Sequence, residues 1–312
     1  MSTLVGVDLG GTNIRAAVAT GAHTHAQPAH APTPGRDGPD AVIEAIAICV
    51  ADAAAGRHVD GLAIGIPGPV DPKRGIVYAA PYLAGWDNFD AASALRARIG
   101  CDVAIHNDAN LAGYAEWIAG AGRGTSDFVF ITASTGVGGA LILNGELYAG
   151  HSGTAGECGH QPLGTEYPAC GEGHVGCLEG TASGTAIARA ARLAVERGER
   201  TSLSGVATEQ LDGRAVQDAA HAGDEVALRI FTHAARTLGR AVGGFINLLS
   251  PEAIAIGGGL INAGELLFGP LRDAVSEMAF TVPAEHCRIV EAELGTDAGL
   301  VGAVAWAVKS FR

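Results

Sequence analysis

Two segments of the chain repeat one pattern, in which a β-strand leads through a glycine-rich turn into a second strand. The first has a strand at Leu4–Asp8, the turn Gly10-Gly11-Thr12 and another strand after it. About 120 residues later, Phe128–Thr132 leads through a turn at 134–139 to Ala140–Leu143. Glycine turns between strands also occur in ordinary hairpins. The repeat predicts a duplicated core whose two glycine turns face each other across a cleft.

The rest of the chain alternates predicted strands with predicted helices, which is typical of an α/β fold. Its 312 residues exceed the ~250 at which single cores stop growing, so two domains are expected. We expect a small N-terminal α/β domain over residues 1–109, completed by a C-terminal helix at 299–312, and a large α/β domain over 110–298. The predicted helices are Ala41–Ala55, Leu111–Ala119, Thr185–Arg197, Asp224–Arg236, Leu238–Leu249 and Gly299–Lys309, the further strands are Gly61–Ile66, Val103–Ile105 and Ala253–Ile256, and Pro28–Pro34 is expected to be a loop.

The composition excludes several classes of protein. Glycine accounts for 46 residues, but 48% hydrophobic and only 17% charged residues argue against disorder, which needs low hydrophobicity and high net charge. The net charge of −13 disfavours binding to nucleic acid or to an anionic membrane. No apolar run reaches the ~18–20 residues of a membrane span, there is no secretory signal, and six cysteines are too few for a disulfide scaffold. We therefore expect a cytoplasmic protein.

Only two residues are lysines, and neither lies in a Walker-type phosphate loop or on a protein-kinase strand. A nucleotide site must therefore hold phosphate by other groups. The turn Gly10-Gly11-Thr12 suits this, because glycines let backbone N–H groups approach an anion and threonine adds a hydroxyl; Asp8 could hold a metal-bound water. Thr135-Gly136 in the second turn offers the same chemistry. A dinucleotide fingerprint is a poor fit there, because Leu141 stands where its last glycine should fall.

Two further strand ends carry residues that are suited to chemistry or to ligand binding. Asp108 follows a predicted strand, where its carboxylate could take a proton from a substrate hydroxyl or merely cap the next helix, for which Asn110 is also suited. Gly257-Gly258-Gly259 follows another strand. That turn would let a ring or ribose lie against the backbone, or it is an ordinary strand–helix turn.

A segment rich in glycine, histidine and cysteine has the residue types of a metal site. Three of the six cysteines lie between residues 158 and 177. His160, Cys170 and Cys177 have zinc-ligand identities, and Glu172 can supply an oxygen, although a carboxylate is a poorer zinc ligand than a thiolate. A set of buried, reduced thiols is the alternative.

Together these motifs resemble the ROK family of sugar kinases, within the actin-like, hexokinase-type ATPase superfamily. The resemblance covers the whole chain. Its most specific part is Thr135–Ala140, Gly150 and Gly156–His160, and Gly65–Asp71 and Asn107–Asn110 fit as well. It implies a two-domain actin-like ATPase (ribonuclease H-like) fold with a duplicated core and an interdomain cleft. It also implies ATP, Mg²⁺ and a structural Zn²⁺ as cofactors, a hexose as substrate, and a homodimer or homotetramer.

The resemblance also implies roles for individual residues. Asp108 would be the catalytic base, and His160 would serve both the zinc and the sugar. The implied sugar-binding residues are Gly68, Asn107, Asp108, Glu157, His160 and Glu179. The implied nucleotide-binding residues are Asp8, Gly10, Gly11, Thr12, Thr135, Gly136, Gly257, Gly258 and Gly259. The implied zinc ligands, within the loop 157–179, are His160, Cys170, Glu172 and Cys177.

This chain departs from the family's pattern in two places. The metal loop of the family usually reads Cys-Gly-Cys, and here Glu172 takes the place of the middle ligand. Cys158 and His174 are candidate substitutes. The family usually has asparagine before the Leu-x-Gly-Trp segment, near the sugar, and here Tyr82 stands there. The second departure bears on which sugar is bound.

The activity implied by the resemblance is transfer of the ATP γ-phosphoryl group to the 6-hydroxyl of a hexose, with glucose as the first choice. N-acetylmannosamine kinase and fructokinase activities are alternatives within the same family. A sugar-sensing ROK protein without turnover is an alternative from another class. The DNA-binding segment of family repressors has no room before residue 8, and the acidic charge also argues for a free-standing kinase.

Overall fold

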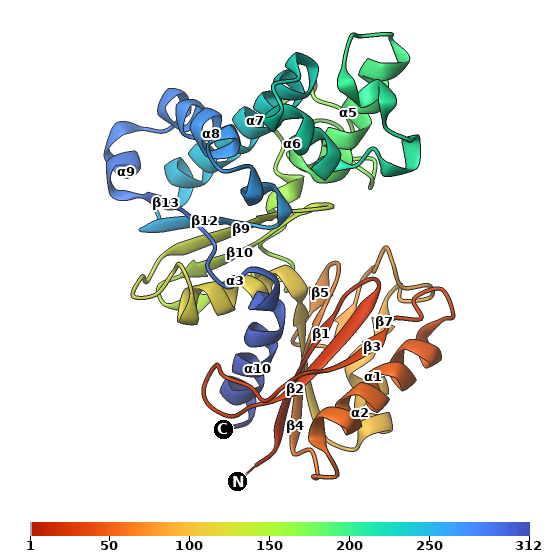
Figure 1. Cartoon of the computed structure of the whole chain (residues 1–312). Coiled ribbons are helices and arrows are strands. Elements are labelled where there is room, and N and C mark those ends of the chain that lie inside the picture. Colours follow the sequence, from red (N-terminus) through yellow and green to blue (C-terminus); the bar gives the residue numbers. More distant parts are fainter. Residues whose placement is uncertain (1) are drawn as a thin grey trace. The chain divides into compact units, whose positions relative to one another are not determined.

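The computed structural model describes residues 2–312, which form two compact units (Figure 1). Unit 1 contains the chain up to Gly124 together with Ala140–Gly156 and Glu293–Arg312. Unit 2 contains Thr125–Gly139 and Glu157–Ala292. The chain thus passes from one unit to the other four times, and three of these passages follow a glycine.

Unit 1 is built on a five-stranded mixed sheet. Its strands are β1 Leu4–Leu9, β2 Asn13–Val18, β3 Ala29–Pro32, β4 Gly61–Ile66 and β8 Asp102–Asn107, and a small separate sheet contains β5 Val70–Asp71, β6 Ile76–Val77 and β7 Phe89–Asp90. The order in the large sheet is β3-β2-β1-β4-β8. β1 is antiparallel to β2 and parallel to β4, which is parallel to β8. β1 and β4 are buried along nearly their whole length, which accounts for their continuous apolar sequences.

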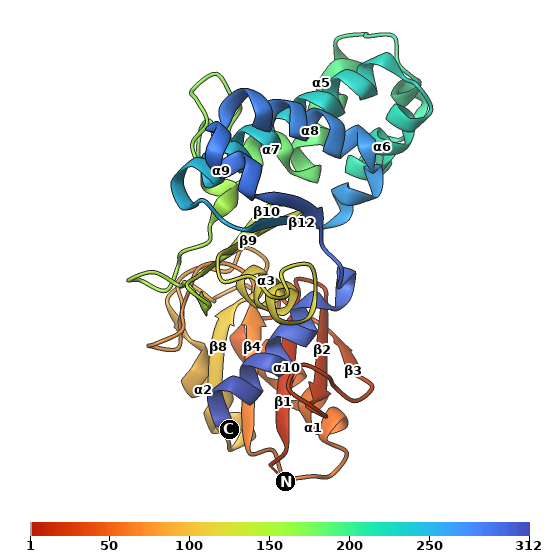
Figure 2. The same ribbon diagram turned by 90° about the vertical axis from the view of Figure 1, so that its left-hand side faces the viewer.

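Helices cover both faces of this sheet (Figures 1 and 2). α1, Pro39–Ala54, and α2, Ala91–Ile99, lie on one face. α10, Ala298–Phe311, lies against β1 and β4 on the other face, as Figure 2 shows. α3, Asp108–Ala119, packs beside α10 and β4. The residues of α3 therefore belong to unit 1, although they follow the domain boundary expected at residue 109.

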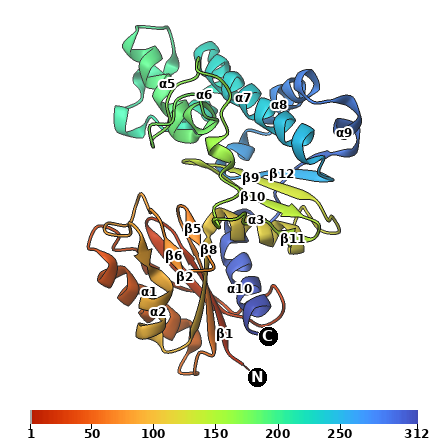
Figure 3. The ribbon, with the colours of Figure 1, turned by 180° about the vertical axis from the view of Figure 1, so that it is seen from behind.

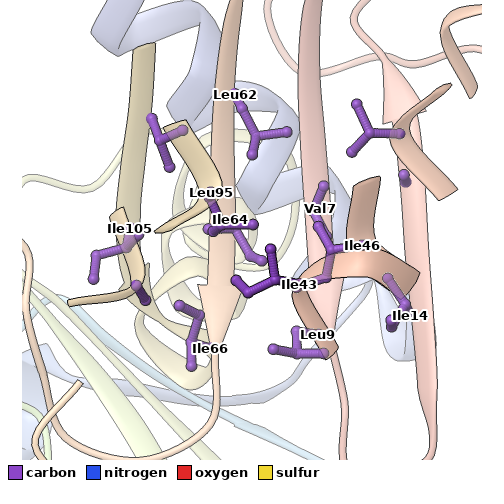
Figure 4. Packing of buried hydrophobic residues seen from close by; sticks show 14 of the residues in the cluster. Val7, Leu9, Ile14, Ile43, Ile46, Leu62, Ile64, Ile66, Leu95 and Ile105 are labelled. Atoms are coloured by element: carbon purple, nitrogen blue, oxygen red, sulfur yellow. The ribbon is translucent and has the colours of Figure 1, made fainter. Parts of the chain in front are cut away.

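The core between this sheet and its first two helices consists of branched aliphatic side chains (Figure 4). Val7, Ile64 and Ile105 come from three neighbouring strands, and they meet Ile46 of α1 and Leu95 of α2. Each of the five is at most 1% exposed. Because burying such a side chain stabilises the fold by roughly 1.5–3 kcal/mol, this core fixes the strand ends from which candidate site residues follow.

Unit 2 combines most of a second five-stranded sheet with a group of helices. The strands of this sheet are β9 Phe128–Ala133, β10 Val137–Leu143, β11 Glu146–Leu147, β12 Ala253–Gly257 and β13 Arg288–Glu291. The helices are α4 Glu179–Ala182, α5 Gly184–Glu196, α6 Gly213–His221, α7 Glu225–Leu249, α8 Glu265–Met278 and α9 Thr281–His286. The strand order is β11-β10-β9-β12-β13, and β10 continues into unit 1 after Gly139. α7 and α8 pack lengthwise against each other (Figure 3).

The predicted α/β class and both strand–glycine-turn–strand segments are confirmed, and two local expectations are wrong. The helices expected at 224–236 and 238–249 form one helix of 25 residues, α7. It continues through Gly239 because that residue is buried against α8, where any side chain would overlap the Leu271 carbonyl. The loop expected at Pro28–Pro34 contains β3, an edge strand, where proline is tolerated. Among residues 2–312, no helix is both long and apolar enough to cross a membrane.

Candidate functional site

The first glycine turn, Gly10–Thr12, connects β1 to β2 in unit 1. Within the turn, Gly10 N donates to Asn13 O at 2.9 Å. Thr33 binds the turn through two hydrogen bonds, since its hydroxyl donates to Gly10 O at 2.8 Å and its N–H to Thr12 O at 2.9 Å. Tyr82 packs on the turn, because a Cβ atom on Gly11 would lie 3.2 Å from Tyr82 Cβ. The turn is therefore a braced backbone loop, the kind of structure that the sequence predicted for phosphate binding.

Asp8, at the end of β1, forms an ion pair with Arg15 of β2. Arg15 Nη2 donates to Asp8 Oδ2 at 2.7 Å, and both side chains are about one-fifth exposed. The same guanidinium also donates to Thr296 O at 2.5 Å and to Asp297 Oδ1 at 3.3 Å. Arg15 was missed in the sequence because it follows the turn rather than lying in it. Its guanidinium is shared between two carboxylates, those of Asp8 and Asp297.

Asp108 is the first residue of α3, and Asn107 precedes it as the helix cap. Asn107 Oδ1 accepts from Asn110 N at 2.9 Å, so Asn107 rather than Asn110 is the cap. Asp108 Oδ1 accepts from Ala109 N at 2.7 Å and from Asn107 Nδ2 at 3.2 Å. These bonds orient the carboxylate at the N-terminus of the helix. An oriented carboxylate is what a general base requires.

Gly68 and Asn107 lie together beside Asp108, as the implied sugar site requires of these three residues. Asn107 Nδ2 donates to Gly68 O at 3.0 Å. Gly68 has φ of +94°, and any side chain on it would overlap the carbonyl of Ala79, so the position needs glycine. The three predicted residues of unit 1 thus form one cluster.

His106, the residue before this cluster, was not singled out in the sequence. It is 2% exposed, and burial lowers its pKa to about 4. Its Nδ1 therefore stays an acceptor at neutral pH, and it takes a hydrogen bond from Asn107 N at 3.0 Å. The Trp306 ring of α10 packs edge-on against it at 5.1 Å between ring centroids. His106 thus fixes the end of β8 from which Asn107 and Asp108 follow.

The second glycine turn, which includes Thr135 and Gly136, is anchored to helices of unit 2. Glu179 Oε2 accepts from Val137 N at 2.9 Å, and a Cβ atom on Gly136 would lie 2.7 Å from the same oxygen. Thr185 of α5 donates its hydroxyl to Thr135 O at 2.8 Å. Glu179, expected to contact the sugar, therefore also braces the predicted phosphate turn.

A cavity of about 680 Å³ in unit 2 brings this turn together with the third glycine turn. Its size is within the usual range for small-molecule sites. Gly259 lines it, whereas Gly257 ends β12 and Gly258, with φ of +86°, packs on the Ala133 carbonyl. The lining includes Thr135, Arg192, Asp212, Arg214, Gln217 and Asn262. Because arginine and aspartate both line it, the cavity suits a polar nucleoside better than a polyanion.

Two other predicted sugar ligands lie at a short 3-10 turn in unit 2, which Glu157 precedes and His160 ends. The turn covers Cys158–His160, and His160 N donates to Glu157 O at 3.1 Å. Glu157 is exposed and His160 is half-buried. Cys158 is buried beneath them, and burial raises its pKa to about 12. Cys158 is therefore an inert thiol at neutral pH, and it does not belong to the group of metal-ligand side chains described next.

The loop that follows brings three metal-ligand side chains together. His160 Nδ1 and His174 Nδ1 lie 4.0 and 3.7 Å from Cys170 Sγ, and the ligand atoms of the three residues are all within 4.8 Å of one another. Cys177 Sγ lies 3.6 Å from His174 O, and its pKa is raised by burial and by the neighbouring Cys170. Glu172 lies on an exposed turn outside this group. His174, one of the two candidate substitutes, lies in the group, and Glu172 does not.

This donor set fits zinc. Two imidazole nitrogens and two thiolates are a common structural zinc set, with bonds of about 2.0–2.3 Å. A tetrahedron with such bonds has edges of about 3.3–3.8 Å. The separations of 3.7 and 4.0 Å from Cys170 Sγ are near those of a loaded site for the three grouped side chains. Cys177 lies outside this group and would have to move toward it to complete the set.

Glu116 of α3 is a further buried acid that the motifs did not reveal. It is fully buried, and its carboxylate accepts three backbone hydrogen bonds, from Ala121 at 3.0 Å, Glu293 at 3.0 Å and Leu294 at 2.7 Å. These segments adjoin two of the points where the chain leaves or enters unit 1, after Gly124 and after Ala292. The one sign of this role in the sequence was a glutamate among the apolar residues of a predicted helix.

Two five-stranded sheets, each with a glycine turn between neighbouring strands, define an actin-like ATPase fold. The chain belongs to the ROK family, whose model matches residues 4–310. A glucokinase of Thermotoga maritima is 35% identical over 97% of this chain and 96% of its own length. The N-acetylmannosamine kinase of Shigella flexneri is 32% identical over 96% of this chain and 97% of its own. A ROK family glucokinase from Streptomyces griseus, crystallised with glucose and AMPPNP, is 33% identical with a TM-score of 0.83, covering 99% of this chain and 100% of that one.

Proposed function

We propose that this protein is an ATP-dependent hexose kinase that phosphorylates glucose at its 6-hydroxyl. The observation that carries the proposal is the placement of Asp108 at the start of α3, oriented by Asn107 and clustered with Gly68. The nearly full-length similarity to proteins named glucokinase supports glucose as the substrate. With this activity, the protein would act in the cytoplasm, in carbohydrate metabolism and specifically in glycolysis.

In the proposed reaction, Asp108 accepts the proton of the sugar 6-hydroxyl as that oxygen attacks the γ-phosphorus of ATP. The bond from the γ-phosphorus to the bridging oxygen breaks, and ADP leaves. Positioning and charge neutralisation account for most of the catalysis in such transfers. The glycine turns would supply backbone N–H groups to the phosphates, and Mg²⁺, when bound, neutralises phosphate charge. We infer that the 680 Å³ cavity, lined by Thr135 and Gly259, receives the nucleoside.

The identity of the sugar depends on the side chains that meet its hydroxyls. Asn107, Glu157, His160 and Glu179 are proposed to bind its hydroxyls. Tyr82 is 59% exposed and packs on the phosphate turn, where the family usually has asparagine. An aromatic ring offers a stacking surface in place of a short amide. N-acetylmannosamine and fructose are the alternative substrates, and a sugar sensor without turnover is the alternative of another class. A homodimer or homotetramer is proposed on family resemblance alone.

A panel of sugars tests the proposed activity. We expect ADP release with glucose and Mg-ATP to exceed that with N-acetylmannosamine or fructose, because the similarity to glucokinases extends over nearly the whole chain. The measurement is coupled ADP release, with sugar binding followed separately by calorimetry. Turnover confined to N-acetylmannosamine would assign that substrate instead. Sugar binding without ADP release would identify a sensor.

We also propose that His160, Cys170, His174 and Cys177 hold one structural zinc ion, which when bound would order the loop and with it His160. Metal analysis of the purified protein should give one zinc per chain. Cys170→Ala and His174→Ala should each lose the zinc and raise the KM for the sugar, because the loop that carries His160 loses its cross-link.

Glu172→Ala provides the matched control for these variants. Glu172 lies two residues from each of Cys170 and His174, yet it is exposed and outside the ligand group. It should retain the full complement of zinc. If Glu172→Ala loses the metal while His174→Ala keeps it, the assignment of His174 is wrong.

A further inference from the structure

Unit 2 contains a second cavity, outside the residues assigned to sugar, nucleotide or metal. Its volume is about 410 Å³, and its walls come mainly from α5 and α7. One part of the lining is apolar and includes Ile187, Leu193 and Ile230. Another part carries three guanidinium groups, those of Arg189, Arg197 and Arg229. The combination suits a ligand with a charged head and an apolar body.

The charges around this cavity are predominantly positive. Its one acidic lining residue, Glu199, is already paired with Arg229. His233 also lines it, and its pKa is lowered by burial and by Arg240, so it is neutral at pH 7. In a chain with a net charge of −13, an arginine-rich cavity is a local exception. It would attract an anion, and the planar guanidinium geometry matches carboxylate and phosphate oxygens.

One lining residue carries a polar group that lacks a partner. The Thr181 side chain is only 8% exposed, and its hydroxyl oxygen is buried without any hydrogen-bond partner. An unsatisfied buried hydroxyl is costly, and such groups call for a specific explanation. A ligand oxygen in this cavity could accept from the hydroxyl only after the Thr181 side chain rotates toward it.

The cavity wall is connected to the metal loop by Arg189. Its Nη1 donates to Ala169 O at 2.8 Å and its Nη2 to Gly180 O at 2.6 Å. Ala169 precedes Cys170, and Gly180 follows Glu179, which braces Val137 in the phosphate turn. Arg189 therefore holds together the residues on either side of the segment 170–179, which carries Cys170, His174 and Cys177. An anion that recruits this guanidinium competes directly with the two carbonyl groups.

We propose that this cavity is a regulatory site for a small organic anion, a phosphate monoester or carboxylate that carries an apolar group. The anionic head binds Arg189 and Arg197, and the apolar group lies against Ile187, Leu193 and Ile230. Occupancy draws Arg189 away from the carbonyls of the metal loop. The loop and Glu179 then loosen, and sugar binding weakens. The regulatory effect rests on the proposed kinase activity, whereas binding of the anion does not.

Phenyl phosphate and benzoate serve as probes, since they combine a charged head with an apolar ring. Calorimetry on the wild-type protein should detect binding of at least one of them, and binding of inorganic phosphate or uncharged benzyl alcohol should be at least about tenfold weaker. A preference between the two probes distinguishes a phosphorylated from a carboxylated ligand. The bound probe should raise the KM for glucose several-fold and leave kcat nearly unchanged.

Arg197→Ala is the decisive variant, because Arg197 is exposed and the structure gives its side chain no hydrogen bond that the fold needs. It should weaken probe binding about tenfold or more, as expected for loss of a charged hydrogen bond, and abolish the rise in KM. Arg200→Ala, at an exposed arginine outside the lining, should change neither.

Three results would overturn the proposal. One is no binding of either probe to the wild-type protein at about 10 mM, a concentration that would still detect a Kd in the millimolar range. Another is equal inhibition of the wild type and Arg197→Ala, which would place the probe in the catalytic site. The third is a change in the oligomeric state of the protein in Arg197→Ala, which would assign the cavity to a subunit interface. If the wild type binds the probe but phosphorylates no sugar, the kinase assignment fails and the anion site stands.

Discussion

Asp108→Asn should lower kcat for hexose phosphorylation by about 10²–10⁴-fold, the usual effect of removing a general base. The variant should remain folded, because Asp108 Oδ1 accepts hydrogen bonds from Ala109 N and Asn107 Nδ2. An asparagine can keep an oxygen in that place. What it loses is the ability to accept the proton of the sugar hydroxyl, so the KM for ATP and for the sugar should change far less than kcat.

Asp52→Asn is the matched control for this change, since Asp52 is an exposed acid of α1 in the same unit. Steady-state kinetics with glucose and Mg-ATP should show wild-type values for the control. A kcat for Asp108→Asn within a few-fold of the wild type would remove Asp108 from the role of base. A parallel loss of ATP binding would mean instead that the substitution disturbed the site as a whole.

Most of the fold could be predicted because its strands are short apolar runs bounded by glycine or polar turns. β4 has the predicted bounds, Gly61–Ile66, and β1 differs from the prediction by one residue. The failures have a common cause, which is that tertiary contacts override local signals. β3 is strand-like because its backbone pairs with β2, despite Pro32 at its end and a proline on either side. α7 does not break at Gly239 or Gly243, where it packs closely on α8.

The candidate site divides along the same line. Proposed site residues that lie in a turn or at a strand end, such as Asp108, Gly68 and Thr135, were predicted from motifs because the motif itself makes the geometry. Residues that act through distant partners were not. His106 accepts from the next residue at a buried position where its pKa is about 4. His174 lies beside His160 and Cys170, where Glu172 was expected, because of how the metal loop folds back. The spacing of residues along the sequence shows neither which side chains become buried nor how a loop folds back on itself.

Glu116 is the clearest case of such a distant partner, and it predicts the largest loss of stability. Its carboxylate accepts from Ala121, Glu293 and Leu294, so it joins the segment after α3 to the segment before α10. Glu116→Ala leaves three backbone N–H groups without their acceptor and opens a hole at a fully buried position. Because each buried donor that loses its partner costs about 1–3 kcal/mol, the free energy of unfolding of unit 1 should fall by roughly 3 kcal/mol or more.

The intrinsic fluorescence of tryptophan measures this loss selectively. The three tryptophans, Trp86, Trp117 and Trp306, all belong to unit 1, so a urea titration followed by their emission reports on that unit. Glu116→Gln should be intermediate, because the amide keeps one acceptor oxygen but turns an N–H toward a backbone donor. Glu44→Ala removes only an exposed ion pair with Arg98 and should leave the midpoint nearly unchanged. If Glu116→Ala unfolds at the same urea concentration as Glu44→Ala, then the three hydrogen bonds contribute nothing to the stability of unit 1.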